Sequence, residues 1–204
     1  MPVRGPGPGN ASQRGQEIIE VQELLAFFVG IGLAATCGFR VFVPLLGLSI
    51  ASYAGYVPVS AGFDWMGTVP AIVAFGIATL LEIGAYYIPW LDSLLDTIAT
   101  PVAIVAGILV TVSVLGELPP FVRWMLGVIA GGGAAGVVQL SSVLVRGTST
   151  ATTGGLGNPL VATVELVASI IGTIVSIVLP ILAAILVVVI LAIILRHRMR
   201  QQTA

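Results

Sequence analysis

Long apolar segments, separated by short stretches rich in polar residues, glycine or proline, run through most of the chain. Six segments stand out, at about residues 24–53, 67–88, 97–116, 121–145, 160–179 and 181–196. Most of them approach the roughly 20 residues that a helix needs to cross the hydrocarbon core of a bilayer. The pattern predicts an all-α membrane protein, a helical bundle of six spans whose first span is kinked or broken. One alternative stays open at Pro180, because 160–195 can also form a single long kinked helix and leave five spans.

Composition supports a membrane protein and excludes other classes. Of the 204 residues, 57% are hydrophobic and 8% are charged, whereas a soluble domain carries about a quarter charged residues. The net charge of -1 offers no basic surface for a nucleic acid. The lipid bilayer is therefore the expected partner, and no nucleic acid is expected.

Arginines gather at the two ends of the chain, outside the apolar segments: Arg4, Arg14, Arg196, Arg198 and Arg200. Cytoplasmic loops of membrane proteins carry an excess of such residues. Both termini are therefore expected in the cytoplasm, which requires an even number of spans. Six spans also place Arg146 inside and Arg123 outside.

A weak internal repeat has a constant offset of 100 residues. Residues 32–35 (GLAA) match 132–135 (GGAA), and Gly47 matches Gly147. A three-span unit repeated once has its second copy inverted in the membrane, as in many small transporters. The expected organisation is a disordered tail (1–20), two three-span halves of a 3+3 inverted repeat (21–118 and 119–196), and a basic tail (197–204).

A single arginine, Arg40, interrupts the first apolar segment. Pro44 follows it by four residues, so within a helix it cannot donate to the Arg40 carbonyl and pushes that carbonyl aside. We expect a kink or break here, with Gly38 and Pro44 as the kink or gate residues. Both the guanidinium and the freed carbonyl need polar partners inside a membrane. Arg40 is either a structural cap of free carbonyls or a guard that faces an anion, with Asp64 as a water-mediated partner.

Two glutamates lie within later segments at similar depth. Glu82 comes near the end of the second segment and Glu165 near the start of the fifth, so both are expected about 10 Å from the same, cytoplasmic, surface. Two such carboxylates can bind a cation or share a proton, and Tyr86 can hydrogen-bond Glu82 from one turn away. The alternative is that each glutamate reaches headgroups or a nearby hydroxyl. The same counting of depth separates Arg40 from Glu82 by more than about 10 Å.

A polar run, GTSTATTGGLG at 147–157, precedes Asn158 and Pro159. Asn is a favoured helix N-cap and Pro suits the first turn, so amides and hydroxyls there can hold an anion. A flexible cytoplasmic loop is the alternative. The sequence shows no nucleophile–base pair, metal-ligand cluster or nucleotide motif, so neither an enzyme nor a metal or cofactor site is expected.

Three motifs carry a family resemblance: ATCGFRVFVPLL at 35–46, Glu82 with YYIPWLD at 86–92, and GGLGNP at 154–159. With them the chain resembles a bacterial family of polytopic membrane proteins classed as a domain of unknown function (number 4126). The resemblance covers most of residues 24–180. It implies a bacterial inner membrane and implies no activity.

These observations favour a small transporter or channel for a small solute or ion, with its site at the interface of the two repeats. The candidate binding residues are Arg40, Glu82, Tyr86, Asn158 and Glu165. Two alternatives remain: a non-catalytic structural or assembly subunit of a larger membrane complex, and a lipid-handling, scramblase-like protein. A homo-oligomer or a membrane-complex partner is compatible with each.

Overall fold

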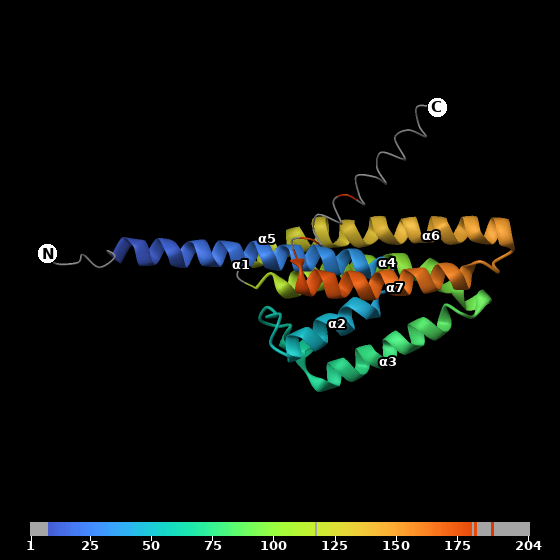
Figure 1. Cartoon of the computed structure of the whole chain (residues 1–204), viewed down its shortest axis with the longest axis horizontal. Helices are drawn as coiled ribbons and strands as arrows, with labels where there is room; N and C mark the ends of the chain where they lie inside the picture. Colours follow the sequence, from blue (N-terminus) through green and yellow to red (C-terminus); the bar gives the residue numbers. More distant parts are fainter. Residues whose placement is uncertain (1–7, 117, 181, 183–188, 190–204) are drawn as a thin grey trace, which may run out of the picture.

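Helices are the regular elements of the part of the chain that the computed structural model describes, residues 8–116, 118–180, 182 and 189 (Figure 1). In chain order they are α1 (Pro8–Cys37), α2 (Phe42–Tyr53), the short 3-10 helix η1 (Asp64–Gly67), α3 (Val69–Ala85), α4 (Pro89–Val114), α5 (Pro120–Leu126), the π-helical stretch η2 (Gly127–Gly132), α6 (Gly133–Thr153) and α7 (Asn158–Val178). The predicted all-α fold is confirmed.

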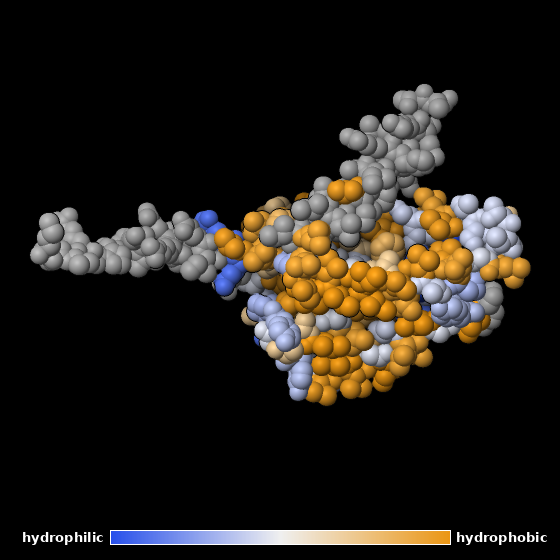
Figure 2. Space-filling view, viewed as in Figure 1, coloured by the Kyte–Doolittle hydropathy of each residue, from blue (hydrophilic) through white to orange (hydrophobic). Residues whose placement is uncertain are grey.

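A band of apolar side chains covers the middle of the bundle. Figure 2 shows this band over α3 and α7, between more polar patches at the two ends. Four helical stretches are long and apolar enough to cross a membrane: Ile19–Cys37, Thr97–Val114, Pro120–Thr153 and Asn158–Val178. Helices α2 and α3 are shorter apolar helices. The chain is therefore a membrane protein, and the predicted sixth segment (181–196) lies outside the described residues apart from Leu182 and Val189.

The chain reverses direction between α1 and α2 instead of continuing as one kinked span (Figure 1). Helix α2 runs in the same direction as α7. Arg40, just before α2, hydrogen-bonds the Ala162 carbonyl, and further along α2 a Cβ on Gly47 would collide with Thr173. The predicted break beside Arg40 is confirmed, but the course of 24–53 as a single span is wrong.

Pro44 and Gly38 explain why the chain breaks at this point. Pro44 lies in the first turn of α2, where a backbone N–H needs no partner inside the helix. Gly38 lies in the turn, where an added Cβ would be 2.6 Å from the Ala135 carbonyl oxygen and 2.6 Å from the Val138 Cβ. The turn therefore packs directly on the backbone of α6, which only glycine permits.

Six passes make up the described bundle: α1, α2, α3, α4, the continuous run α5–η2–α6, and α7 (Figure 1). Successive passes run in opposite directions, so α7 ends beside the middle of α1, at the end of the bundle that α1 enters. The segments matched in the repeat, 32–35 and 132–135, lie in α1 and at the η2–α6 junction, and these helices run in the same direction. An inverted copy would run the opposite way, so the three-plus-three inverted repeat is not shown.

Small residues bring the long helices close together at the centre of the bundle. A Cβ on Gly107 of α4 would lie 2.8 Å from the Gly131 carbonyl oxygen and 3.4 Å from the Ala34 Cβ. The Thr111 hydroxyl also donates to the Gly30 carbonyl, at 3.2 Å. Membrane helices associate through such contacts, so these glycines serve packing.

Two helices extend beyond the predicted boundaries. Helix α1 begins at Pro8, inside the stretch 1–20 that composition predicted as a disordered tail. Helix α6 continues to Thr153, through much of the expected loop 147–157, and ends where Gly154 has a positive φ of 64°. A left-handed glycine is a common helix stop. The hydroxyl-rich segment is therefore largely helical.

Candidate functional site

The buried face of α7 is mostly polar, the reverse of a helix in a soluble protein. Its buried residues recur three or four positions apart: Asn158, Ala162, Glu165, Ser169, Thr173 and Ser176. Leu160, Val164 and Ile174 are exposed on its other faces. From Asn158 to Ser176 the polar face spans roughly 27 Å, close to the thickness of a bilayer core. We call its five polar residues the polar seam.

Arg146 of α6 pairs with Glu165 in the middle of this seam. Their exposed fractions are 2% and 5%. The Arg146 Nε lies 3.2 Å from Glu165 Oε1, and its Nη2 donates to Oε2, so the contact is bidentate. Ser142, one turn before Arg146, also donates to Oε1. Glu165 therefore has a full counter-ion within the fold.

Arg40 approaches the same carboxylate from the turn between α1 and α2, and it is 1% exposed. Its Nη2 donates to the Ala162 carbonyl at 2.8 Å and lies 3.9 Å from Glu165 Oε2, which is beyond hydrogen-bond distance. Its Nε and Nη1 are buried and have no hydrogen-bond partner among the described residues. Arg40 therefore has a neutral acceptor but no hydrogen-bonded counter-ion.

Both guanidinium groups pack on the ring of Tyr86, which is buried at the C-terminal end of α3. The Cζ atoms of Arg40 and Arg146 lie 3.8 Å and 4.1 Å from the ring centroid. An aromatic face attracts cations, so the ring helps to hold two like charges near one carboxylate. Tyr86, expected as a partner of Glu82, thus contacts both arginines.

Glu82 binds the start of α2. Its Oε1 accepts the Val41 N–H at 2.8 Å and its Oε2 accepts the Phe42 N–H at 3.1 Å. A carboxylate is stabilised at the positive end of a helix. Because Arg40 directly precedes Val41, Glu82 and Arg40 are neighbours, and their expected separation is wrong. The break folds α2 back along α3, which counting along one span does not allow for.

We call Arg40, Glu82, Tyr86, Arg146 and Glu165 the charge cluster. Its two glutamates meet at one level of the bundle, but not at the end predicted from counting spans. The reversal after α1 places the end of α3 and the first turns of α7 opposite the start of α1 (Figure 1). Arg146 shares this level instead of marking a membrane surface.

Two further residues singled out from the sequence lie away from the charge cluster. Gly157, not Asn158, is the N-cap of α7, and the Asn158 side chain donates to the Thr150 hydroxyl at 3.0 Å. Asn158 thus joins the ends of α6 and α7 at one end of the seam. Asp64 lies beyond the far end of α2 and accepts the Gly62 N–H at 3.1 Å, so it is not the partner of Arg40.

Close packing seals the seam on the other side of the charge cluster, at Thr36 of α1. The Ser169 hydroxyl donates to the Thr36 carbonyl at 3.4 Å, and the Thr173 hydroxyl lies 3.5 Å from the Thr36 hydroxyl. A Cβ on Gly172 would collide with Thr36. The seam is therefore closed at this level in the observed conformation.

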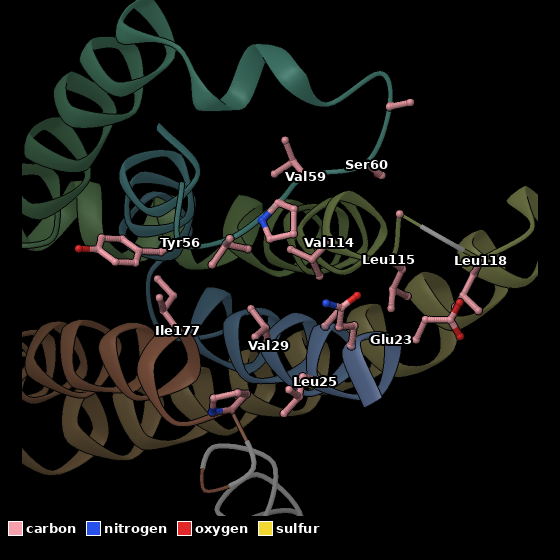
Figure 3. A pocket seen from close by; sticks show the side chains of 17 residues that line it. Glu23, Leu25, Val29, Tyr56, Val59, Ser60, Val114, Leu115, Leu118 and Ile177 are labelled. Atoms are coloured by element: carbon pink, nitrogen blue, oxygen red, sulfur yellow. The ribbon is translucent and has the colours of Figure 1, made fainter. Parts of the chain in front are cut away.

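A cavity of about 590 Å³ lies beyond this seal, at the end of the bundle where α1 begins (Figure 3). Helix α1, the loop after α2 and the ends of α4 and α7 form its wall. Val29 and Ile177 line it from α1 and α7, and Glu23 is the charged residue of the lining. Because Ile177 directly follows Ser176, the cavity lies at the level of the last residue of the seam.

A second hollow, of about 390 Å³, opens between α6 and α7. Its lining is apolar at Phe39, Val145 and Val164, and it also includes Ser142 and Glu165. These two polar residues belong to the contacts around the charge cluster. The hollow therefore opens at the outer surface of the bundle beside Glu165, whose carboxylate is buried in its contacts with Arg146 and Ser142.

Sequence reasoning missed Arg146 and the hydroxyls of the seam. The apolar pattern ends the fourth predicted span at residue 145 and so predicts Arg146 as a cytoplasmic charge, whereas the structure buries it. The signal that reveals it is periodicity: Gln139, Ser142 and Arg146 share one buried face of α6, as the polar residues of α7 do. Polar residues at helical spacing inside apolar segments predict an enclosed polar face.

Fold and site together define a small all-α membrane protein with a charge cluster enclosed by its helices. The profile of the family described as "Domain of unknown function (DUF4126)" matches residues 27–200, and the chain belongs to this family. The expected family resemblance is therefore confirmed. No curated protein and no solved structure matches the chain.

Proposed function

We propose that the chain is a small, non-enzymatic transporter of the bacterial inner membrane that carries a small solute or ion. The observation that supports this is the polar seam, with the charge cluster in its course, inside an otherwise apolar bundle. Buried polar and charged groups are costly in a membrane. A bundle that only had to be stable would be served as well by apolar side chains of similar volume.

The closed seam and the broken helix favour a carrier over an open channel. Discontinuous helices that end beside a central site are common in transporters. Here the start of α2 lies at the charge cluster, and its middle packs on the seam where Gly47 meets Thr173. Movement of α7 away from α1 and α2 would open the contacts at Thr36 and join the charge cluster to the cavity in Figure 3.

Glu82 is the coupling carboxylate in this proposal, and Arg40 and Glu165 form the binding site. Protonation of Glu82 removes the charge that strengthens its two bonds to the start of α2. The contact between α3 and the turn at Arg40 then weakens. Uptake of a proton at Glu82 would thus free α2 to move.

The test is flux into liposomes that contain the purified protein. Pyranine fluorescence after a pH step reports protons, and light scattering after an osmotic step reports the permeation of sodium salts, urea or glycerol. We expect at least one flux above that of protein-free liposomes, lowered about tenfold or more in Glu82→Gln and Arg40→Gln. Glu20→Gln and Arg123→Gln, at the other end of the bundle, serve as matched controls. Folded wild-type protein that moves none of these probes would remove the proposal.

The hollow between α6 and α7 favours lipid handling as a second candidate function. An apolar groove at the lipid-facing surface, with a buried carboxylate beside it, suits a lipid that travels between leaflets. Fluorescent phospholipid in proteoliposomes, quenched from outside by dithionite, measures this exchange. Exchange that Val145→Trp and Val164→Trp abolish by filling the hollow would support this candidate, and wild-type protein without exchange would exclude it.

A further inference from the structure

We propose that the guanidinium of Arg40 is the receptor for a small monovalent anion such as chloride, nitrate or formate. The substrate class of the transporter is then a small monovalent anion, and this part of the inference rests on the proposed function. The binding site itself rests on the hydrogen bonds and charges around Arg40.

The first step concerns hydrogen bonds. An arginine carries one N–H on Nε and two on Nη1, and in Arg40 these atoms are buried without an acceptor among the described residues. With 1% of the residue exposed, bulk water does not reach it. Unpaired buried donors on a charged group are costly, so this edge of Arg40 requires an acceptor.

The second step concerns charge. The Glu165 carboxylate is already bidentate with Arg146 and lies 3.9 Å from Arg40 Nη2. The Glu82 carboxylate is matched by the N–H groups at the start of α2, the positive end of that helix. The two arginines and the two glutamates balance in number, but among the described residues both carboxylates form their hydrogen bonds with groups other than Arg40. A monovalent anion would supply the missing partner with the smallest change in the charge of the cluster.

The third step concerns size. The centroid of the Tyr86 ring lies 3.8 Å from the Arg40 Cζ. The Ala162 carbonyl accepts a hydrogen bond from Arg40 Nη2 at 2.8 Å. The edge that remains is the one formed by Nε and Nη1. A small ion of one charge suits an enclosed edge of this kind, whereas a divalent anion such as sulfate is larger and brings two negative charges close to Glu165.

The experiment is calorimetric titration of the purified protein in detergent micelles with sodium nitrate, chloride or formate, in sodium gluconate at constant ionic strength. We expect saturable binding of the small anions and none of sodium sulfate. In Arg40→Lys, which keeps the charge but loses the planar set of donors, the Kd should rise about tenfold or more, the loss of one charge-assisted hydrogen bond. Arg123→Gln should bind as the wild type does.

A second measurement uses the wild-type protein alone and so does not depend on the folding of a variant. The thermal midpoint of the wild type, followed by tryptophan fluorescence, should rise with nitrate in a saturable way and stay constant in gluconate of equal ionic strength. Equal responses to nitrate and gluconate would show that water alone serves Arg40 and would overturn the inference. So would unchanged anion affinity in folded Arg40→Lys.

The outcome separates this inference from the proposed function. Anion binding at Arg40 by a protein that moves none of the probes leaves the binding site standing and removes the transporter. Flux of protons or of a neutral solute by a protein that binds no small anion does the reverse.

Discussion

At the scale of single residues, Glu165 is the most demanding position in the molecule. Its carboxylate accepts hydrogen bonds from two nitrogens of Arg146 and lies near a second buried guanidinium, that of Arg40. Removal of one member of a buried ion pair leaves the other charge uncompensated. The stability of the bundle therefore depends on this side chain more than on any surface charge.

Replacing Glu165 by Gln should destabilise the fold by about 3–5 kcal/mol, because both buried arginines lose their negative neighbour. Unfolding in mixed micelles, followed by tryptophan fluorescence, measures the change. Glu20→Gln, at an exposed position of α1, is the matched control and should change the free energy of unfolding by less than about 0.5 kcal/mol.

The double variant Arg146→Gln with Glu165→Gln tests the cause of that loss. A neutral pair leaves one fewer uncompensated charge, so the double variant should be more stable than Glu165→Gln alone. Equal stability of the two would show that Arg146 does not depend on Glu165.

At the scale of the helices, the apolar pattern predicted where most segments lie, but not the direction in which each runs. Hydropathy and Pro44 are compatible with a kinked span and with a reversal, because a proline kinks a continuous helix, where it removes one hydrogen bond, and also suits the first turn of a new helix. The choice depends on contacts between distant parts of the chain, such as Arg40 with Ala162 and Val41 with Glu82. Local sequence does not encode these contacts, so the candidate residues were predicted individually and their arrangement was not.

Gly38 tests the reversal at this scale. In Gly38→Ala the new Cβ would lie 2.6 Å from a carbonyl oxygen and 2.9 Å from a backbone nitrogen of α6. Backbone cannot rotate away as a side chain can, so we expect a loss of about 1–3 kcal/mol in the free energy of unfolding. Gly133→Ala, with nothing within 4 Å of the new Cβ, should instead be neutral or more stable by up to about 1 kcal/mol. Equal effects in the two variants would argue against the close approach.

Gly172 tests the seal of the seam. In Gly172→Ala the new methyl collides with the Cγ2 methyl of Thr36, so we expect a loss of about 1–3 kcal/mol. Thr36→Ser removes that methyl and keeps the hydroxyl. In a Thr36→Ser background the same glycine substitution should therefore cost less. A double-mutant cycle of thermal midpoints measures the coupling, and strict additivity would mean that the two positions do not touch.

At the scale of the whole molecule, the reversal decides which loops share a side of the membrane. With α1 and α2 as separate passes, the loop after α2 lies at the end where α1 begins, together with the cavity of Figure 3. A single span over 24–53 would place that loop on the opposite side. Arg123 also lies toward the start of α1, and Arg146 is buried, so the arginine count by itself no longer orients the chain.

Cysteine labelling distinguishes these arrangements. In a Cys37→Ala background, Ser12→Cys and Ala61→Cys should react with a membrane-impermeant maleimide from the same side of the membrane. Thr152→Cys, at the end of α6, should react from the other side. Labelling of Ala61→Cys and Thr152→Cys from one side would contradict the reversal. Intact and lysed cells compared on gels provide the measurement.

The charge cluster also determines when, during biosynthesis, the contacts of Arg40 can be completed. Arg40 leaves the ribosome more than a hundred residues before Ala162 and Glu165, the groups that receive it in the finished protein. Helix α2, with 12 residues, is too short to be inserted as an independent span. A nascent chain that has reached only α4 already holds Tyr86 and Glu82, but it lacks the carbonyl and the carboxylate that α7 brings to Arg40. The last third of the polypeptide thus completes the surroundings of an arginine in the first third.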